Sequence, residues 1–141
     1  MSGPVTVDAS VFVSAFTPSE PAHAASKSFL RGLAEAAPPI FLPALAMVEI
    51  AAAIGRGQVR PELGAAFASE VIQLPQVALI GLDERLAREA AEIAARHRLR
   101  ASDAVYIAVA RRFAATLITL DKEQRRRAAA VVKVRHPGRA V

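Results

Sequence analysis

Residues 4–16 read PVTVDASVFVSAF, a short apolar stretch that ends at Asp8 and is followed by a second apolar run. Residues 4–7 predict a β-strand, because they are rich in β-branched side chains, and residues 9–16 predict a helix. The same order returns later in the chain, where residues 116–120, TLITL, predict a strand whose next residue is Asp121. Two predicted strands therefore each lead directly into an aspartate.

Strands and helices alternate along the rest of the chain. Ser19 is expected to cap a helix that opens near Pro21. The run LAMVEIAAAI at residues 45–54 predicts a helix that is buried on all sides except at Glu49. Further elements are expected as strands at residues 40–42, 77–82 and 131–134, and as helices at residues 61–72, 83–97 and 101–114. This alternation predicts an α/β fold, a single domain over residues 1–141 with a central parallel sheet flanked by helices on both faces.

The composition favours an ordinary folded domain and excludes some kinds of site. The chain has 141 residues, of which 53% are hydrophobic and 5% aromatic, which suits helices packed on a sheet. It contains no cysteine, so disulfides and thiolate-bound metals are excluded. No run approaches the ~20 apolar residues of a membrane span, and the N-terminus lacks the basic region of a secretory signal. A cytoplasmic location is expected.

The charge distribution favours an anionic partner. Eighteen Lys and Arg against thirteen Asp and Glu give a net charge of +5, and such an excess attracts polyanions. The cations fall into clusters: Arg96, Arg98 and Arg100; Arg111 and Arg112; Lys122 with Arg125, Arg126 and Arg127; and Lys133, Arg135 and Arg139. The alternative is that each cluster is only a solvated helix face. Nucleic acid becomes the favoured ligand when these clusters are combined with the acids described next.

Four acidic residues stand out by their positions. In open parallel sheets the ligand crevice lies outside the carboxyl ends of the strands, so Asp8 and Asp121 are expected to face one cleft. Glu49 and Asp103 are each the lone acid in an otherwise apolar helical run, and a carboxylate withdrawn from water needs a compensating partner. Four acids in one cleft would repel one another. A hard divalent cation with oxygen ligands relieves that repulsion best.

Each of these acids also has a purely structural alternative. Asp121 could cap the following helix, and Asp103 could favour the positive end of its own helix. Asp8 could be a turn residue, although the order strand, Asp, helix favours function. Glu49 is the hardest to explain structurally, because its helix carries no cation until Arg56.

The chain resembles the PIN-domain nucleases, and more closely the VapC-like toxins of toxin–antitoxin pairs. The resemblance covers essentially the whole chain and rests on four segments, VTVDASVFVSAF (5–16), MVEIAAAI (47–54), LRASDAVYIAVA (99–110) and LITLDKEQ (117–124). It implies a parallel sheet wrapped by helices, an acidic pocket for Mg²⁺ or Mn²⁺, RNA cleavage, a homodimer and inhibition by a cognate antitoxin. Two positions depart from the family pattern: Ser102 replaces an aromatic residue that is common there, and Gln124 replaces an apolar one.

The expected mechanism gives each acid a role in catalysis. Asp8 and Asp103 are expected to bind the metal directly, and Asp121 to bind it directly or through water. Glu49 is expected to hold a water molecule or to help deprotonate the attacking one. The hydroxyls of Ser10 and Thr119 are expected to orient the neighbouring carboxylates or contact a phosphate, although either could only pair locally.

Three other functions compete with this one. A phosphatase of the haloacid dehalogenase type would need an aspartate where this chain has Ser10, and a receiver domain would need adjacent N-terminal acids. A non-catalytic RNA-binding or partner-binding module on the same fold is the main alternative, and the presence of all four acids argues against it. Cleavage of DNA by the same chemistry stays open, because nothing in the sequence reads a 2′-hydroxyl.

Overall fold

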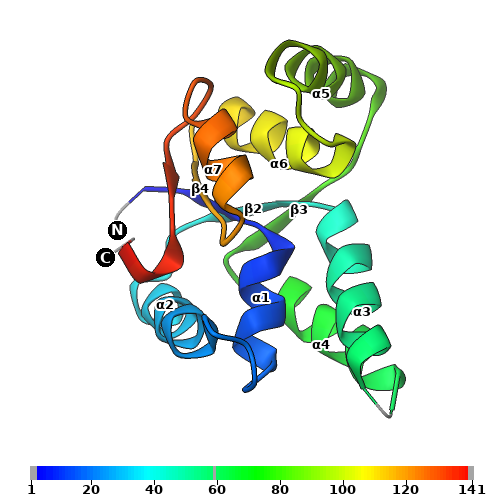
Figure 1. The fold of residues 1–141 in the computed structure, drawn as a ribbon, viewed down its shortest axis with the longest axis vertical. Coiled ribbons are helices and arrows are strands. Elements are labelled where there is room, and N and C mark those ends of the chain that lie inside the picture. Colours follow the sequence, from blue (N-terminus) through cyan, green and yellow to red (C-terminus); the bar gives the residue numbers. More distant parts are fainter. Residues whose placement is uncertain (1–2, 59, 140–141) are drawn as a thin grey trace.

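The computed structural model describes residues 3–58 and 60–139 (Figure 1). One five-stranded sheet and the helices that cover it account for the regular structure of these residues. The elements are β1 (Val5–Val7), α1 (Ala9–Phe16), α2 (His23–Ala36), β2 (Ile40–Pro43), α3 (Leu45–Gly57), α4 (Glu62–Ile72), β3 (Val77–Ile80), α5 (Glu84–His97), α6 (Ala101–Arg112), β4 (Thr116–Ile118), α7 (Lys122–Ala128), β5 (Val134–Arg135) and the 3₁₀ helix η1 (Pro137–Arg139).

The sheet confirms the α/β fold expected from the sequence. Its strands run in the order β3-β2-β1-β4-β5, and each neighbouring pair is parallel. Helices α1 to α4 lie on one side of the sheet and α5 to α7 on the other (Figure 1). Within the described residues, none of the helices combines the length and apolar character that a membrane crossing requires.

The chain changes direction across the sheet at β1. From β1 it moves to β2 and β3 on one side, and later returns to β4 and β5 on the other. In the central pair, Val5 lies beside Thr116 and Val7 beside Ile118, so β1 and β4 end at the same edge. This is a topological switch point, the place where open parallel sheets bind ligands. The segments after β1 and β4 therefore meet where a site is expected.

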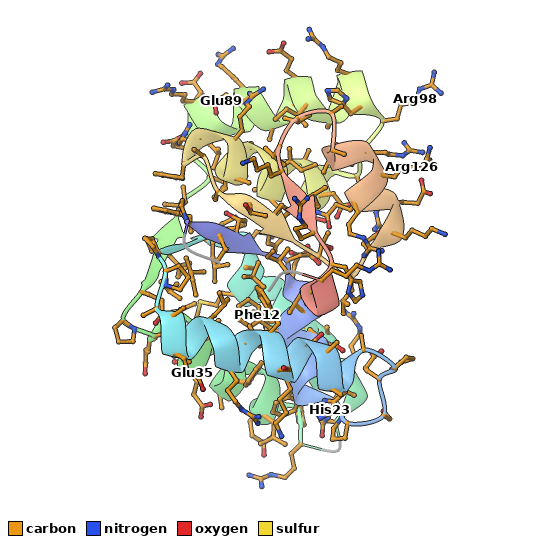
Figure 2. All side chains as sticks on the ribbon, turned by 90° about the vertical axis from the view of Figure 1, so that its left-hand side faces the viewer. Phe12, His23, Glu35, Glu89, Arg98 and Arg126 are labelled. Carbon is orange, nitrogen blue, oxygen red and sulfur yellow. The ribbon has the colours of Figure 1, made fainter. Side chains whose placement is uncertain are left out.

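Complete burial explains the apolar central elements. All three residues of β1 are fully buried, and every residue of α6 from Ala104 to Ala110 is buried. A strand covered by helices on both faces has no solvent side, so its sequence need not alternate. Phe12 of α1 is 2% exposed and packs in the core on the opposite side of the sheet from α6 (Figure 2).

The last strand is β5 at Val134–Arg135 rather than residues 131–134, and two other local predictions were wrong. Ser19 caps no helix, because residues 17–22 form successive turns and α2 begins only at His23, after an N-cap residue without a side-chain hydrogen bond. Helix α3 is not buried on all sides, since Met47 is 37% exposed and Val48 is 62% exposed. Its apolar outer face contributes to a groove of about 690 Å³ beside α4.

Two backbone positions restrict the residue type that they can carry without strain. Gly64 of α4 faces α3, where an added Cβ would overlap the carbonyl oxygen of Ala51 and lie 2.9 Å from the backbone nitrogen of Gly55. Helix α2 ends at Ala37 with φ 50°, in the left-handed region that glycine usually occupies.

Gln124 is 1% exposed, and its side-chain amide has no hydrogen-bond partner among the described residues. The departure from an apolar residue at this position thus leaves an unsatisfied amide in the core.

Candidate active site

Asp8 follows β1 directly and caps α1. Its carboxylate accepts a hydrogen bond from the amide of Ser10 at 3.0 Å, and its own amide donates to the carbonyl of Ile118 in β4 at 2.8 Å. The side chain is 8% exposed. Burial raises the pKa of Asp8 to about 6; the hydrogen bonds from Ser10 oppose this change, and the charges of Glu49 and Asp103 add to it. The charged form of Asp8 is therefore costly in this position.

Asp121 both caps a helix and faces the site. Its Oδ1 accepts a hydrogen bond from the amide of Gln124 at 3.0 Å and so caps the N-terminus of α7. Its Oδ2 accepts a hydrogen bond from Arg100 at 2.9 Å. Strand β4 ends at Ile118, earlier than expected, and Thr119 accepts a hydrogen bond from the amide of Asp121 at 3.1 Å. The capping alternative is thus correct for one carboxylate oxygen, while the other pairs with Arg100.

Asp103 lies in the first turn of α6 and shares a cation with Asp121. Its Oδ2 accepts a hydrogen bond from Nε of Arg100 at 3.2 Å, and its side chain is 13% exposed. Burial raises the pKa of Asp103, the Arg100 charge opposes this, and the Asp121 charge adds to it. The arginine that bridges both acids is itself 76% exposed.

Glu49 enters the site from α3 with one oxygen unsatisfied. Its Oε1 is buried and has no hydrogen-bond partner among the described residues. Its carboxylate shares a side-chain hydrogen bond with Tyr106 of α6, whose hydroxyl oxygen also accepts a hydrogen bond from the amide of Ala9 at 3.2 Å. Burial raises the pKa of Tyr106, and the charges of Asp8 and Glu49 raise it further, so the phenol keeps its proton beside these carboxylates.

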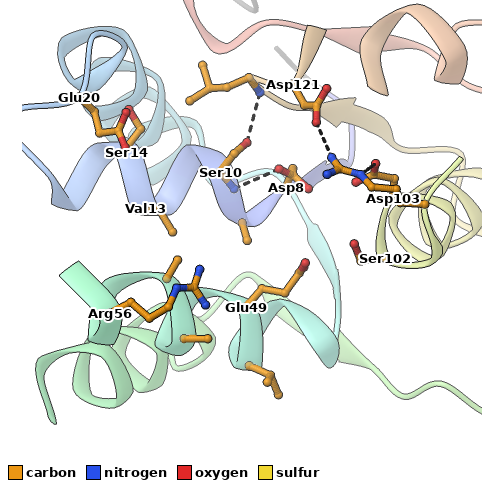
Figure 3. A pocket seen from close by; sticks show the side chains of 16 residues that line it. Asp8, Ser10, Val13, Ser14, Glu20, Glu49, Arg56, Ser102, Asp103 and Asp121 are labelled. Atoms are coloured by element: carbon orange, nitrogen blue, oxygen red, sulfur yellow. Dashed lines mark hydrogen bonds and ion pairs between the residues drawn. The ribbon is translucent and has the colours of Figure 1, made fainter. Parts of the chain in front are cut away.

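The four acids line one pocket of about 670 Å³ at the carboxyl edge of the sheet. Figure 3 shows Asp8, Asp103 and Asp121 on one side of this pocket, with Glu49 directed toward them from α3. Ser10 also lines it, and its hydroxyl accepts a hydrogen bond from the amide of Leu120 at 3.3 Å. Thr119, in contrast, is fully buried, so its contact with the Asp121 backbone gives it only a supporting position.

The pocket is partly neutralised by its own arginine. Among the described residues, no three acidic or histidine side chains lie close enough together to hold one metal ion. Arg100 contacts two of the four acids, Asp103 and Asp121, which brings a positive charge between them. For Asp8 and Asp103, burial contributes more to the raised pKa than the repulsion between acids that the sequence suggested.

The side chains nevertheless fit a hard divalent cation. All the acidic groups offer carboxylate oxygens, the ligands that Mg²⁺ and Mn²⁺ prefer. Oε1 of Glu49 is buried without a partner, and the charge of Asp8 is poorly compensated. A cation held by Asp8 and Glu49 would correct both deficiencies.

Sequence reasoning missed three residues of this site. Arg100 precedes Asp103 by three residues and Tyr106 follows it by three, so both lie on its side of α6 or the turn before it. Tyr106 is the only tyrosine in the chain. Arg56 lines the same pocket from α3, and within the described residues it has no ion pair. Helical spacing around Asp103 was the signal that could have identified the first two.

The basic clusters divide into paired and unpaired cations. Arg96 pairs with Glu92 four residues earlier, and Arg126 and Arg127 both pair with Glu123. These cations fit the alternative of a solvated helix face, where ion pairs contribute little. Figure 2 shows Arg98 and Arg126 projecting from the same side of the molecule. Within the clusters, the described cations without an ion pair are Arg98, Arg111, Lys122, Arg125, Lys133, Arg135 and Arg139; outside the clusters, Lys27, Arg31 and the pocket residue Arg56 have none either.

Comparison with solved structures finds similar folds among toxin proteins. VapC20 of Mycobacterium tuberculosis, described as a sarcin–ricin loop cleaving toxin, is 21% identical with a TM-score of 0.74, over 93% of this chain and 98% of that chain. A toxin–antitoxin complex from Klebsiella pneumoniae matches at 16% identity and a TM-score of 0.69, over 94% and 97%. VapBC2 from Rickettsia felis, bound to a promoter DNA fragment, matches at 12% identity and a TM-score of 0.71, over 94% and 98%.

Comparison of the sequence itself identifies the family. No curated protein matches the chain. The family model of the PIN domain matches residues 5–130, which include all four acids and every strand of the sheet except β5. The chain therefore belongs to the PIN-domain family.

Proposed function

We propose that the protein is a Mg²⁺- or Mn²⁺-dependent endoribonuclease that acts as the toxin of a toxin–antitoxin pair. The observation that carries this proposal is that Asp8, Glu49, Asp103 and Asp121 come from four separate segments and line one pocket at the switch point of the sheet. Membership of the PIN family and the likeness to VapC-type structures support a nuclease rather than another use of the same fold.

The mechanism follows from the surroundings of each acid. Asp8 and Asp103 would hold the metal, and Asp121 would assist through the oxygen that does not cap α7. A bound divalent cation supplies charge that stabilises the pentavalent transition state at phosphorus. Glu49 lines the pocket from α3, and its carboxylate accepts a proton from the attacking water. The Ser10 amide holds the Asp8 carboxylate and the Ser10 hydroxyl holds the backbone amide of Leu120, whereas the Thr119 hydroxyl holds that of Asp121.

A nucleic acid is the proposed substrate because unpaired cations lie beside an acidic pocket, and the resemblance to VapC-like toxins favours RNA. Arg98 precedes the first turn of α6 and Lys122 begins α7, close in sequence to Asp103 and Asp121 respectively. Contacts of such cations with phosphates release counterions, so binding should weaken steeply as salt rises. An affinity for RNA that stays flat between low and moderate salt would argue against this role of the basic residues.

Cleavage of a mixed RNA panel tests the activity directly. The parent protein should cut RNA with Mg²⁺ or Mn²⁺ and lose the activity in EDTA. Asp8→Asn should remove cleavage while the circular dichroism spectrum and the melting transition stay cooperative. Activity retained in a highly purified Asp8→Asn protein would contradict the site, and RNA binding without any cleavage by the parent would favour the non-catalytic module instead.

A cognate antitoxin and a second copy of the chain are the proposed protein partners. The apolar groove beside α4 shares Val48, Ala52 and Arg56 with the acidic pocket, so a segment seated in the groove could reach the acids. We expect such a segment to place an arginine or lysine among them and block metal binding. A complex that forms and leaves cleavage undiminished would refute this, and light scattering on the purified protein would test the homodimer.

A further inference from the structure

Arg100 forms the wall between two adjoining pockets. It lines the acidic pocket, and it also lines a second pocket of about 330 Å³ on the side of α7. Asp103 and Asp121 line both pockets as well. We call the second one the side pocket; its charged lining residues are Arg98, Arg100, Asp103, Asp121, Glu123 and Arg127.

Arg100 is held in this wall by ion pairs rather than by packing. Its Nε contacts Asp103 at 3.2 Å and a terminal nitrogen contacts Asp121 at 2.9 Å, yet the side chain is 76% exposed. Little apolar surface is lost when such a side chain turns away, so its position depends on the two carboxylates. Anything that takes over these carboxylates would release the guanidinium.

The charge of the side pocket depends on that exchange. Three arginines face three acids there, so the lining as it stands is balanced. Suppose that a divalent cation compensates the charges of Asp103 and Asp121. The positive charges of the three arginines in the lining are then balanced by Glu123 alone. Arg127 is already fixed by its pair with Glu123 and by donating to the carbonyl of Arg98, so the frame around the pocket is preformed.

We propose that Arg100 is an exchangeable counter-ion, and that its release turns the side pocket into a binding site for a backbone phosphate of the RNA strand. This inference rests on the proposed function, because it needs a divalent cation at the acids and RNA in the adjoining pocket. The planar guanidinium suits both roles, since it can bridge two carboxylates or bind one phosphate through two N–H groups.

Metal and RNA should consequently bind with positive coupling. A cation at the acids frees the arginine for the phosphate, and a phosphate that holds the arginine frees the acids for the cation. Such coupling is reciprocal by thermodynamic necessity, so each ligand should tighten the other by the same factor. Without Arg100, the metal should meet no competitor and the phosphate should lose its partner. The two affinities should then change in opposite directions.

The test measures two affinities in Arg100→Ala and in a matched control. Arg56→Ala removes the same charge from the acidic pocket, but Arg56 contacts none of the acids among the described residues. Mn²⁺ binding is measured by calorimetry without RNA. Binding of a mixed-sequence 2′-O-methyl RNA oligonucleotide is measured by fluorescence anisotropy at fixed ionic strength, in EDTA and in Mn²⁺, and its integrity is checked on a gel.

Opposite changes in the two affinities would support the proposal. Arg100→Ala should bind Mn²⁺ about three- to tenfold more tightly than the parent, as expected for the loss of two competing ion pairs. It should also lose most of the gain in oligonucleotide affinity that Mn²⁺ gives the parent. Arg56→Ala should keep that gain. Arg100→Lys should lie between, because an ammonium lacks the planar fork that bridges two carboxylates. Melting curves in EDTA show that each variant is folded.

Two failures are distinguishable. If the parent binds no Mn²⁺, the metal-dependent function fails and this proposal fails with it. If the parent binds Mn²⁺ and cleaves RNA, and Arg100→Ala matches Arg56→Ala in both affinities, then only the exchange of Arg100 is refuted.

Discussion

The ionisation of Asp8 should destabilise the metal-free protein, and Asp8→Asn should reverse this. Burial raises the pKa of Asp8 from an ordinary value of 3.8 to about 6. Between these two pH values the folded protein binds a proton that the unfolded chain has already lost. The free energy of unfolding therefore falls as the pH rises through this window, and the loss is complete above pH 6.

The size of the effect follows from the width of that window. One pH unit corresponds to 1.36 kcal/mol, so the loss amounts to about 3 kcal/mol. No reduction for solvent screening is needed, because the side chain is only 8% exposed. Asparagine keeps the shape, carries no charge and also caps helices. We expect Asp8→Asn to exceed the parent in stability by about 1 to 3 kcal/mol at pH 7.5, and by much less at pH 3.5.

Urea denaturation in EDTA from pH 3.5 to 8 provides the measurement. The difference in free energy of unfolding between the two proteins should grow with pH up to about 6 and then level off. A parent that is more stable than Asp8→Asn at every pH, or a difference independent of pH, would refute the argument from burial. Adding Mn²⁺ should stabilise the parent through ligand linkage and the variant much less.

Three further predictions concern stability. In EDTA, Asp103→Asn should be as stable as the parent or more stable by an amount on the order of 1 kcal/mol, because the pKa of Asp103 is raised. When Mn²⁺ is added, the melting temperature of this variant should rise less than that of the parent. Gly64→Ala should lower the free energy of unfolding by about 1 to 3 kcal/mol, because the added Cβ overpacks α4 against α3. Gly32→Ala, where an added Cβ meets nothing within 4 Å, should raise it by about 0.5 to 1 kcal/mol. Equal effects of the two changes in urea melts would contradict the close helix contact. Ala37→Gly should stabilise by about 0.5 to 1 kcal/mol because φ is 50° there, and a loss of stability would show that the left-handed cap is not strained.

The sequence predicted the elements best where the pattern depends on neighbours along the chain. Asp83 caps α5 as expected, with its carboxylate accepting from the amide of Leu86 at 2.8 Å, and residues 9–16 form the predicted helix α1. The wrong prediction of a helix cap at Ser19 also has a local origin. A serine shortly before a proline gives the same sequence pattern whether the residues after it form a helix or a series of turns. The error in α3 does not, since exposure of Val48 depends on what packs outside the helix.

The sequence by itself determined the order of strands and helices and the positions of the four acids, because hydrophobic periodicity and strand ends are properties of short segments. Only the tertiary structure decided which charges meet. Arg100 and Asp121 are 21 residues apart, and the hydroxyl of Tyr106 accepts from an amide 97 residues away. Such contacts depend on how α6 crosses the sheet and on the register of β1 with β4. These are set by packing of the whole core, which no local pattern encodes.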